Sequence, residues 1–278
     1  MKNKKVILIS GVSSGFGYAS AEYLARKGYL VFGTSRTPEK VMFPKIENWL
    51  GSLEIIKMDV NYVNSIGEGI NKIIEKTGTL DVVLNNAGYS LAGSIEDTSL
   101  NEAKDQFNTN FFGVHEICRQ VIPIMRKQKS GYIINISSLA GLVGLPFQAL
   151  YSASKYAIEG YTEALRIEVK PFGIKVSLIE PGDFYTSFTK NRHLAKSSQS
   201  NPVYQNRFKG TLEAIEESER KGDSPEKIAR LAEKIINTDS PRLRYKIGPG
   251  SKLIGLKPFL PERIIENIIT RYYSSNLK

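Results

Sequence analysis

The chain has 278 residues, of which 41% are hydrophobic and 24% are charged, so it can bury a large core as a globular protein. The net charge of +10 comes from lysines and arginines that are spread along the chain, and no nucleic-acid motif is present, so we expect no nucleic-acid partner. The single cysteine, Cys118, excludes an internal disulfide, and no apolar run is long enough for a transmembrane helix or a signal peptide; we therefore expect a cytoplasmic protein.

Apolar strands alternate with helical segments as far as Pro181. Strands are expected at 6–10, 29–35, 53–58, 80–84, 132–136 and 174–179. Helices are expected at 15–27, 63–76 and 151–170, and residues 100–127 form one long helix or two joined ones. Near-continuous apolar strands are typical of a parallel sheet covered by helices on both faces. The pattern predicts an α/β fold of Rossmann type with a doubly wound parallel sheet.

The pattern loosens after Pro181. Residues 190–206 are polar and are interpreted as a mobile segment, followed by helices at 211–221 and 225–237 and an edge strand at 245–247. We expect one domain over 1–278, with a substrate lid at about 183–222 and a C-terminal extension at about 223–278. An amphipathic helix at 261–273, with Arg263, Arg271 and Lys278 nearby, is expected to pack on its own domain or a second subunit; contact with a membrane surface is the alternative.

The first expected strand ends in a glycine-rich turn, Ser10 to Gly17, of sequence SGVSSGFG. Glycines let a backbone turn tightly and approach a pyrophosphate, which the N-terminus of the following helix then stabilises. The candidate cofactor-binding residues here are Gly11, Ser13, Ser14, Gly15, Phe16 and Gly17. A tight strand-to-helix turn without a ligand would use the same residues, so further motifs are needed.

Tyr151 and Lys155 share one face of an expected helix because they are four residues apart. An ammonium beside a phenol favours the phenolate and lowers the phenol pKa from about 10, which makes Tyr151 a candidate general acid and base. Tyr23 and Lys27 have the same spacing, so the pair alone proves little. Ser138, thirteen residues before Tyr151, adds a hydroxyl at the end of an expected strand.

Five separated motifs, in order from residue 10 to about residue 186, resemble those of the classical short-chain dehydrogenase/reductase family. They are the glycine turn; Asn85-Asn86-Ala87-Gly88; Asn110; the set Ser138, Tyr151 and Lys155; and Pro181-Gly182 with Thr186. The family usually has threonine where this chain has Ser10, which keeps the hydroxyl group. The resemblance implies an oxidoreductase that interconverts an alcohol and a ketone or aldehyde by hydride transfer.

The resemblance also implies a role for each motif. Tyr151 would exchange a proton with the substrate oxygen, and Lys155 would lower the pKa of Tyr151 and bind the nicotinamide ribose. Ser138 would hold the substrate oxygen, and Asn110 would order a water in a proton relay. The family's spacing selects Ser138, although Ser137 beside it leaves that choice open. The remaining cofactor contacts implied are Asn86, Ala87 and Gly88 in the pocket wall, Asp59 and Val60 at the adenine, and Pro181, Gly182 and Thr186 over the nicotinamide.

The end of the second expected strand favours NADP over NAD. An acidic residue there would bind the ribose 2′-hydroxyl and repel a phosphate, but none occurs before Glu39. Arg36 can pair with a 2′-phosphate instead. The alternative is that Arg36 stacks on the adenine or points to water.

The substrate pocket is expected to be apolar and aromatic, which suits a bulky apolar alcohol or ketone. Its candidate residues are Ser90, Leu91, Ala92, Leu139, Leu145, Pro146, Phe184, Tyr185 and Phe188, with Tyr204 and Phe208 in the lid. The resemblance implies a homodimer or homotetramer. Neither His115 nor His193 has a clustered partner, so no metal site is expected. A non-enzymatic NADP-binding sensor or scaffold is the alternative function, and a sugar-nucleotide epimerase fits the glycine spacing less well.

Overall fold

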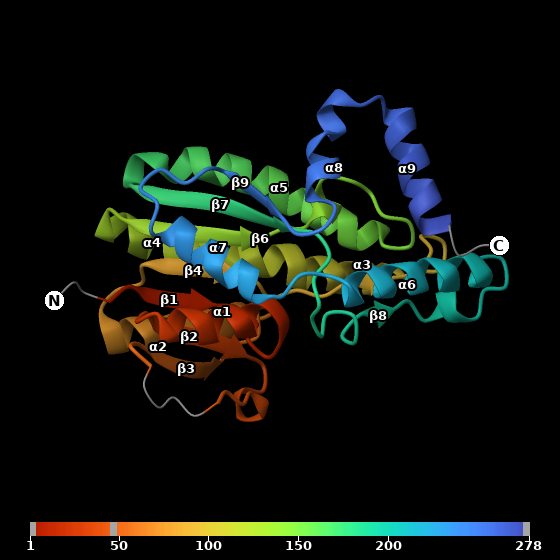
Figure 1. The fold of residues 1–278 in the computed structure, drawn as a ribbon. Coiled ribbons are helices and arrows are strands. Elements are labelled where there is room, and N and C mark those ends of the chain that lie inside the picture. The colour runs from red at the N-terminus through yellow and green to blue at the C-terminus, as the bar shows by residue number, and fades with distance from the viewer. Residues whose placement is uncertain (1–3, 45–48, 275–278) are drawn as a thin grey trace.

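The computed structural model describes residues 4–44 and 49–274. Its centre is a seven-stranded sheet in the order β3-β2-β1-β4-β6-β7-β9, in which every neighbouring pair is parallel (Figure 1). The chain therefore winds outward in both directions from β1 and β4, as the doubly wound prediction requires. The strands are β1 (Val6–Ile9), β2 (Leu30–Ser35), β3 (Ser52–Lys57), β4 (Val82–Asn85), β6 (Gly131–Ile136), β7 (Ile174–Pro181) and β9 (Arg244–Ile247).

Helices cover both faces of this sheet. On one face, α1 (Gly15–Arg26) and α7 (Glu226–Ile236) bury Leu24 and Ile228 against the strands. On the other face lie α2 (Val63–Thr77), α4 (Gly113–Gln128) and α5 (Ala149–Val169), which bury Ile66, Ile117 and Ile158. Because both faces are covered, the strands can be apolar on both sides, which explains their near-continuous apolar sequences.

The expected long helix at 100–127 is two helices joined by a wider turn. α3 (Leu100–Phe107) leads into a π-helical turn, Asn108–Phe112, and α4 continues from Gly113. The turn buries the side chain of Asn110 and brings it to the loop after β4, where it donates a hydrogen bond to the Tyr89 carbonyl oxygen. π-helical turns inside helices are rare and often accompany functional positions.

The segment at 190–206 differs from the prediction of a mobile polar loop. β8 (His193–Leu194) pairs with β5 (Leu91–Ala92) in a second, two-stranded sheet. Ala195 and Ser198 are fully buried, and the Ser198 hydroxyl accepts a hydrogen bond from the Ser94 amide at 3.0 Å. The polar composition suggested a solvent-exposed loop. A polar side chain such as that of Ser198 can nevertheless be buried, because its hydrogen-bond partner comes from a segment far away in the sequence.

The C-terminal part adds α6 (Gln205–Arg220), α8 (Ser251–Gly255) and α9 (Glu262–Ser274). α8 and α9 rise from the body beside α5 and α6 and form an arm at the upper right of Figure 1. The expected edge strand at 245–247 is confirmed as β9, the expected amphipathic helix is α9, and α8 was not predicted. Lys278 lies outside the described residues. Among the residues described, no helix combines the length and the apolar character that crossing a membrane requires.

Candidate active site

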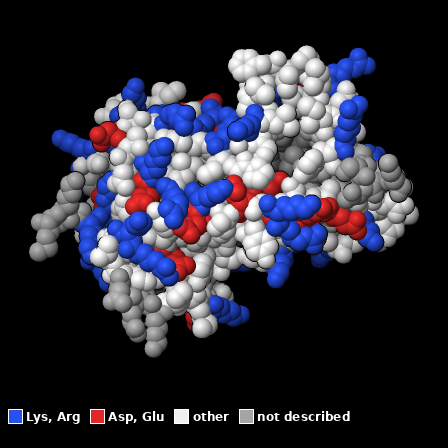
Figure 2. All heavy atoms as spheres, viewed as in Figure 1, with Lys and Arg blue, Asp and Glu red and all other residues white. Residues whose placement is uncertain are grey.

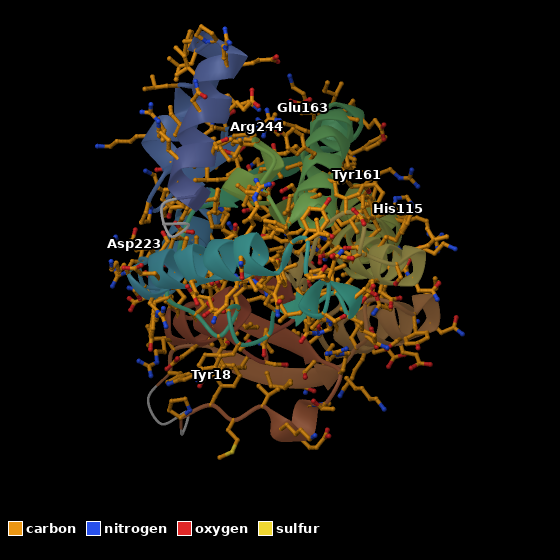
Figure 3. All side chains as sticks on the ribbon, turned by 90° about the vertical axis from the view of Figure 1, so that its right-hand side faces the viewer. Tyr18, His115, Tyr161, Glu163, Asp223 and Arg244 are labelled. Carbon is orange, nitrogen blue, oxygen red and sulfur yellow. The ribbon has the colours of Figure 1, made fainter. Side chains whose placement is uncertain are left out.

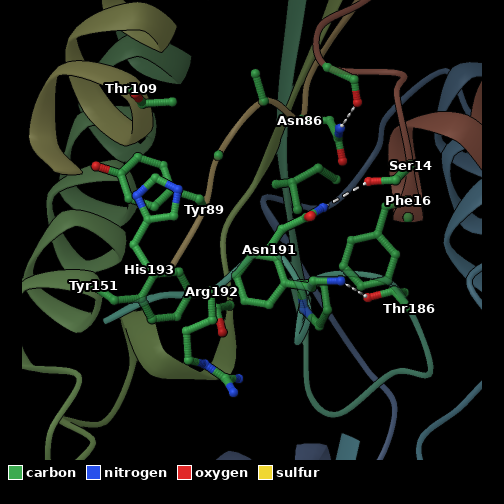
Figure 4. A pocket seen from close by; sticks show the side chains of 18 of the residues that line it. Ser14, Phe16, Asn86, Tyr89, Thr109, Tyr151, Thr186, Asn191, Arg192 and His193 are labelled. Atoms are coloured by element: carbon green, nitrogen blue, oxygen red, sulfur yellow. Dashed lines mark hydrogen bonds between the residues drawn. The ribbon is translucent and has the colours of Figure 1, made fainter. Parts of the chain in front are cut away.

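A cavity of about 1040 Å³ opens where the parallel strands end (Figure 4). It brings together most of the residues that the sequence predicted from five separate motifs. Among the predicted catalytic and cofactor-binding residues, Gly17 and Asn110 do not line it. The predicted residues that do are Gly11, Ser13, Ser14, Gly15, Phe16, Arg36, Asp59, Val60, Asn86, Ala87, Gly88, Ser138, Tyr151, Lys155, Pro181, Gly182 and Thr186.

The glycine turn has the shape of a pyrophosphate cradle. Gly11 and Gly15 have φ angles of +72° and +60°, where an L side chain would be strained. A Cβ atom on Gly17 would lie 2.2 Å from the Gly11 carbonyl oxygen, so the chain can pass there only as glycine. Ser14 is extended and its side chain does not cap α1, and Ser14, Gly15 and Phe16 line the cavity, so the uncapped N-terminus of α1 lies at the cavity and suits an anion. The residues present therefore fit the diphosphate of a dinucleotide.

Ser10 and Asn86 fix the cradle to the end of β4. The Ser10 hydroxyl accepts hydrogen bonds from the amides of Asn86 and Ala87 at 3.0 and 3.1 Å. In return, the Asn86 side chain donates to the Ser10 and Gly11 carbonyl oxygens at 3.0 and 2.8 Å. A hydroxyl is what this position needs, so the serine in place of the family's threonine keeps the contact.

The adenosine end of the cavity is lined by hydroxyl groups and one arginine. Ser13 and Ser35 share a hydrogen bond of 3.0 Å, and the Thr37 amide donates to the Ser35 hydroxyl at 3.1 Å. Arg36 lines the cavity and is exposed, whereas Glu39 does not line it. Asp59 lies further along the wall, where its carboxylate accepts from the Asn61 amide at 3.0 Å.

Ser138, Tyr151 and Lys155 form one group at the inner end of the cavity. The hydroxyls of Ser138 and Tyr151 are hydrogen-bonded to each other. Lys155, one turn along α5, donates to the Ile136 carbonyl oxygen at 2.8 Å, with Nζ 5.8 Å from the centre of the Tyr151 ring. Both Ser137 and Ser138 line the cavity, but the Ser137 hydroxyl is buried and has no hydrogen-bond partner within the described part of the chain, so the geometry favours Ser138.

Burial sets the charge states of this group. It raises the pKa of the Tyr151 phenol to about 12, against a smaller lowering by the Ser138 hydrogen bond. It also lowers the pKa of the Lys155 ammonium to about 8, which the charge of Glu159 opposes. The lowering of the Tyr151 pKa by Lys155 stays a prediction: Lys155 donates to the Ile136 carbonyl oxygen, and the pKa of Tyr151 is raised because desolvation is the largest effect. Tyr151 is a protonated phenol at neutral pH.

Asn110 acts on this group from behind the cavity wall. Its side chain accepts from the Tyr89 amide at 3.1 Å and donates to the Tyr89 carbonyl at 3.0 Å. It also donates at 3.1 Å to the Ser154 hydroxyl, which in turn donates to the Tyr151 carbonyl at 2.7 Å. The π-helical turn thus connects the loop after β4 to α5.

The Pro181-Gly182 segment crosses the cavity toward the glycine turn. The Gly182 amide donates to the Ile247 carbonyl at 2.8 Å, and a Cβ atom on Gly182 would lie only 1.9 Å from the Pro249 carbonyl oxygen. Thr186 reaches Gly15, 3.7 Å from the position of an added Cβ atom, and its hydroxyl accepts from the Phe188 amide at 3.1 Å. The lid therefore begins directly over the pyrophosphate cradle.

The substrate half of the cavity is only partly as predicted. Leu145, Phe184 and Phe188 line it, and the Phe188 ring centre lies 5.9 Å from that of Tyr151. Pro146 lines a second cavity, described below. The other candidates line neither cavity: Ser90, Leu91, Ala92 and Leu139 are buried, Tyr185 is exposed, Tyr204 is bonded to Glu96, and Phe208 packs on Phe147.

Sequence reasoning missed the charged residues in this half. Asp183, Arg192 and Glu219 line the cavity near Tyr151, and Tyr273 of α9 closes its floor. Arg192 and Glu219 form an ion pair of 2.6 Å although they are 27 residues apart, so no local pattern announces them. The sequence offered one indication of their role, because Arg192 and Glu219 both lie within the predicted substrate lid.

The cysteine and the two histidines pack against neighbouring side chains. Cys118 is fully buried in α4 and belongs to the hydrophobic core. His115 contacts Tyr161, and the His193 ring lies tilted against that of Tyr89 where both line the cavity. Over residues 4–44 and 49–274, no group of three His, Cys, Asp or Glu side chains could hold a metal ion.

The parallel sheet, the cradle at its carboxyl edge and the tyrosine–lysine pair define a dinucleotide-binding α/β oxidoreductase. The family model for the short chain dehydrogenase matches residues 5–197. A protein of Bacteroides thetaiotaomicron called 3-ketodihydrosphingosine reductase is 41% identical over 97% of this chain and 98% of its own length. A solved short-chain dehydrogenase from Streptomyces avermitilis has a TM-score of 0.83 at 30% identity and covers all of both chains. The NADP-bound ElxO structure has a TM-score of 0.69 at 27% identity, over 88% of this chain and 97% of that one.

The chain belongs to the short-chain dehydrogenase/reductase family. It is an NAD(P)-dependent oxidoreductase that acts on alcohol and carbonyl groups.

Proposed function

We propose that this enzyme uses NADPH to reduce a ketone that carries a long apolar chain. The observation that supports it is the position of Tyr151, a protonated phenol in the wall of the cofactor cavity, which shares Leu145 and Tyr273 with a second, mainly apolar cavity. A proton donor next to an apolar space suits carbonyl reduction on a lipid-like substrate.

The chain's own residues would supply the proton and the positioning. When bound, NADPH provides a hydride for the carbonyl carbon. Tyr151 donates its phenolic proton to the carbonyl oxygen, and Ser138 donates a hydrogen bond to the same oxygen. Proton donation of this kind is worth about 10²–10⁴ in rate. Burial lowers the pKa of Lys155 to about 8, so most of its ammonium groups are still charged at neutral pH. This positive charge would favour the Tyr151 phenolate that is left after proton donation.

Asn110 is proposed as a positioning residue. It touches neither cavity but holds the Tyr89 loop and, through Ser154, the backbone of Tyr151. Its loss would move the phenol away from the substrate oxygen, and misplacement by about 1 Å can cost about 10² in rate.

The second cavity would hold the apolar chain. Its volume is about 1290 Å³, and it lies between α5, the lid and the arm of α8 and α9. Leu145 and Tyr273 line both cavities, so a chain attached to a carbonyl at Tyr151 has a direct route across them. The apolar lining of this second cavity includes Ile95, Leu142, Val143, Pro146, Phe147, Ile254, Leu260, Ile265 and Ile269.

Two comparisons support the substrate and cofactor choices. The relative that is 41% identical over nearly the full length is called a 3-ketodihydrosphingosine reductase, and that name describes reduction of a ketone on a long-chain base. The related ElxO structure holds NADP. In this chain, Arg36 and the hydroxyls of Ser13, Ser35 and Thr37 line the adenosine end, which suits a ribose 2′-phosphate.

The test is NADPH oxidation with alkanones of increasing chain length. Burial of each methylene is worth about 0.8 kcal/mol, so kcat/KM should rise by about threefold to fourfold per carbon until the cavity is filled. Tyr151→Phe should lose about 10³-fold in kcat, whereas the matched Tyr23→Phe on α1 should keep wild-type rates. Equal rates in the two variants would show that Tyr151 is not the proton donor, whereas binding of NADPH without its oxidation by any ketone would favour a binding-only function.

Two isoleucines of α9 provide a test variant and a control variant for the second cavity. Ile269 lines the second cavity, whereas Ile264 on the same helix is exposed and lines neither cavity. Ile269→Glu should abolish the gain with chain length, and Ile264→Glu should leave it. A gain that survives Ile269→Glu would place the chain elsewhere.

A further inference from the structure

Three charged side chains stand in the substrate half of the active-site cavity. The Arg192 side chain is 2% exposed, and its Nη2 lies 2.6 Å from Oε1 of Glu219. The second carboxylate oxygen of Glu219 accepts from the Thr189 hydroxyl. Asp183 lies at the start of the lid, where Ser218 of α6 donates to its Oδ2 at 2.5 Å. Figure 4 shows Arg192 beside Tyr151, with its guanidinium directed away from Ser14 and Phe16.

These charges are close enough to act on the catalytic phenol. After burial, which is the largest cause, the charges of Glu219 and Asp183 raise the pKa of Tyr151, while the Ser138 hydrogen bond and the Arg192 charge lower it. The same two carboxylates and Arg192 act on the phenol of Tyr273 on the floor of the cavity. The cluster thus lies between the position of the reacting carbonyl and the route to the second cavity.

The cluster has more negative than positive charge. Two carboxylates face one buried guanidinium; Lys190 also lines the cavity, but its side chain is exposed and water screens it. Burial raises the pKa of Asp183, which shows that its carboxylate lacks full compensation. A substrate cation placed here would supply the missing charge.

The ion pair with Glu219 leaves part of the hydrogen-bonding capacity of Arg192 unused. Nε and Nη1 of Arg192 are buried without a hydrogen-bond partner among the described residues, and the nearest other carboxylate, Glu216, is 3.9 Å from Nη1. A pair that only tied the lid to α6 would leave these donors buried with nothing to replace their lost hydration. Donors left free at a ligand cavity are instead suited to an oxygen of the ligand.

We propose that Asp183, Arg192 and Glu219 form a polar-head subsite that binds an ammonium group next to the reacting carbonyl, with the carboxylates contacting the ammonium and Arg192 a neighbouring hydroxyl. This inference rests on the proposed function and deepens it: the substrate is an amino ketone with an apolar chain. The subsite would also reject ketones whose carbonyl adjoins an anionic group, because they would meet two partly buried carboxylates.

The test compares two long-chain ketones that differ only in an amino group on the carbon beside the carbonyl. At about pH 6.5 the amine is protonated, since a free α-amino group titrates at roughly 7.7–8.0. The wild type should prefer the amino ketone in kcat/KM by about 10- to 100-fold, as expected for a charge-assisted contact. Glu219→Gln and Asp183→Asn should each reduce this ratio by about tenfold. The control is Glu217→Gln, an exposed neighbour on α6 that pairs with Lys221 and should keep the ratio.

A binding measurement separates the subsite from turnover. Titration of the enzyme–NADP complex with the matching amino alcohol and plain alcohol should show the same preference and the same loss in Glu219→Gln and Asp183→Asn. Equal use of the two ketones by the wild type would overturn the subsite and leave the proposed function standing. If neither long-chain ketone is reduced while NADPH still binds, the proposed function fails instead.

Discussion

A buried carboxyl group behind the active site makes the stability of this protein depend on pH in an unusual direction. Glu180, near the end of β7, is completely buried. Arg244 Nε lies 3.2 Å from one of its oxygens, but the same nitrogen donates to Glu159 at 2.8 Å, and Lys246 is 3.7 Å away. Figure 3 shows that Arg244 also lies near Glu163, with which it forms a third ion pair. Arg244 therefore compensates no single carboxylate fully.

Burial and the neighbouring Glu159 raise the pKa of Glu180 to about 7, against the opposing charges of Lys246 and Arg244. The native state therefore keeps a proton that the unfolded chain loses at about 4.5, so stability falls as pH rises from about 4.5 to about 7. At about 1.36 kcal/mol per pH unit, this loss is at most about 3 kcal/mol. Glu180→Gln fixes the neutral form and removes the loss.

The assay is urea unfolding at two pH values. At about pH 8, Glu180→Gln should be about 1–3 kcal/mol more stable than the wild type, and the gain should shrink below about 1 kcal/mol at about pH 5. Glu163→Gln is the matched control, because it removes a half-exposed partner of the same arginine and should change stability by less than about 1 kcal/mol. A destabilised Glu180→Gln at pH 8 would refute the reasoning, since it would mean that attraction to Arg244 and Lys246 outweighs burial.

Three further predictions concern the cofactor side. Arg36→Ala should raise the Kd for NADPH by about 10- to 100-fold in a fluorescence titration and leave the Kd for NADH within about threefold; equal weakening of both would contradict the phosphate contact. Gly182→Ala should destabilise the protein by more than about 2 kcal/mol, because its Cβ atom meets the Pro249 oxygen, while Gly160→Ala in the open surface of α5 should stabilise it by up to about 1 kcal/mol in the same thermal unfolding assay. Ser10→Ala should cost about 2–4 kcal/mol, since two amides lose their acceptor; a cost below about 1 kcal/mol would show that the turn relaxes around the change.

The sheet and the cofactor half of the site were predictable because their causes are local. A strand buried on both faces must be apolar throughout, so each strand could be placed by its own residues. Gly11, Gly15 and Gly17 are required by φ angles and close approaches within one turn. Pairing of parallel strands then brings all these turns to one edge without any further information from the sequence.

The substrate half could not be predicted for the opposite reason. Its determinants are contacts between segments that no periodicity links, as with Arg192 and Glu219. Residues that look like pocket lining because they are apolar, such as Leu91 and Leu139, are simply core. The segment at 190–206 was expected to be mobile because it is polar, but Ser198 and Asn201 bind Ser94 and Asp97, which lie far away in the sequence.

The charge states at the catalytic centre also depend partly on local spacing and partly on contacts between distant segments. Spacing correctly placed Lys155 beside Tyr151, but it could not say that desolvation exceeds the effect of the ammonium charge on the phenol. That balance depends on how the lid and α6 close over the phenol, since Glu219 and Asp183 add negative charge from that side. A protonated Tyr151 is the form that can give a proton to the carbonyl oxygen as the hydride reaches the carbon. A substrate ammonium between these carboxylates and the phenol would offset their charge and lower the pKa of Tyr151 toward neutrality, so that the proton leaves more readily when the cationic substrate is bound.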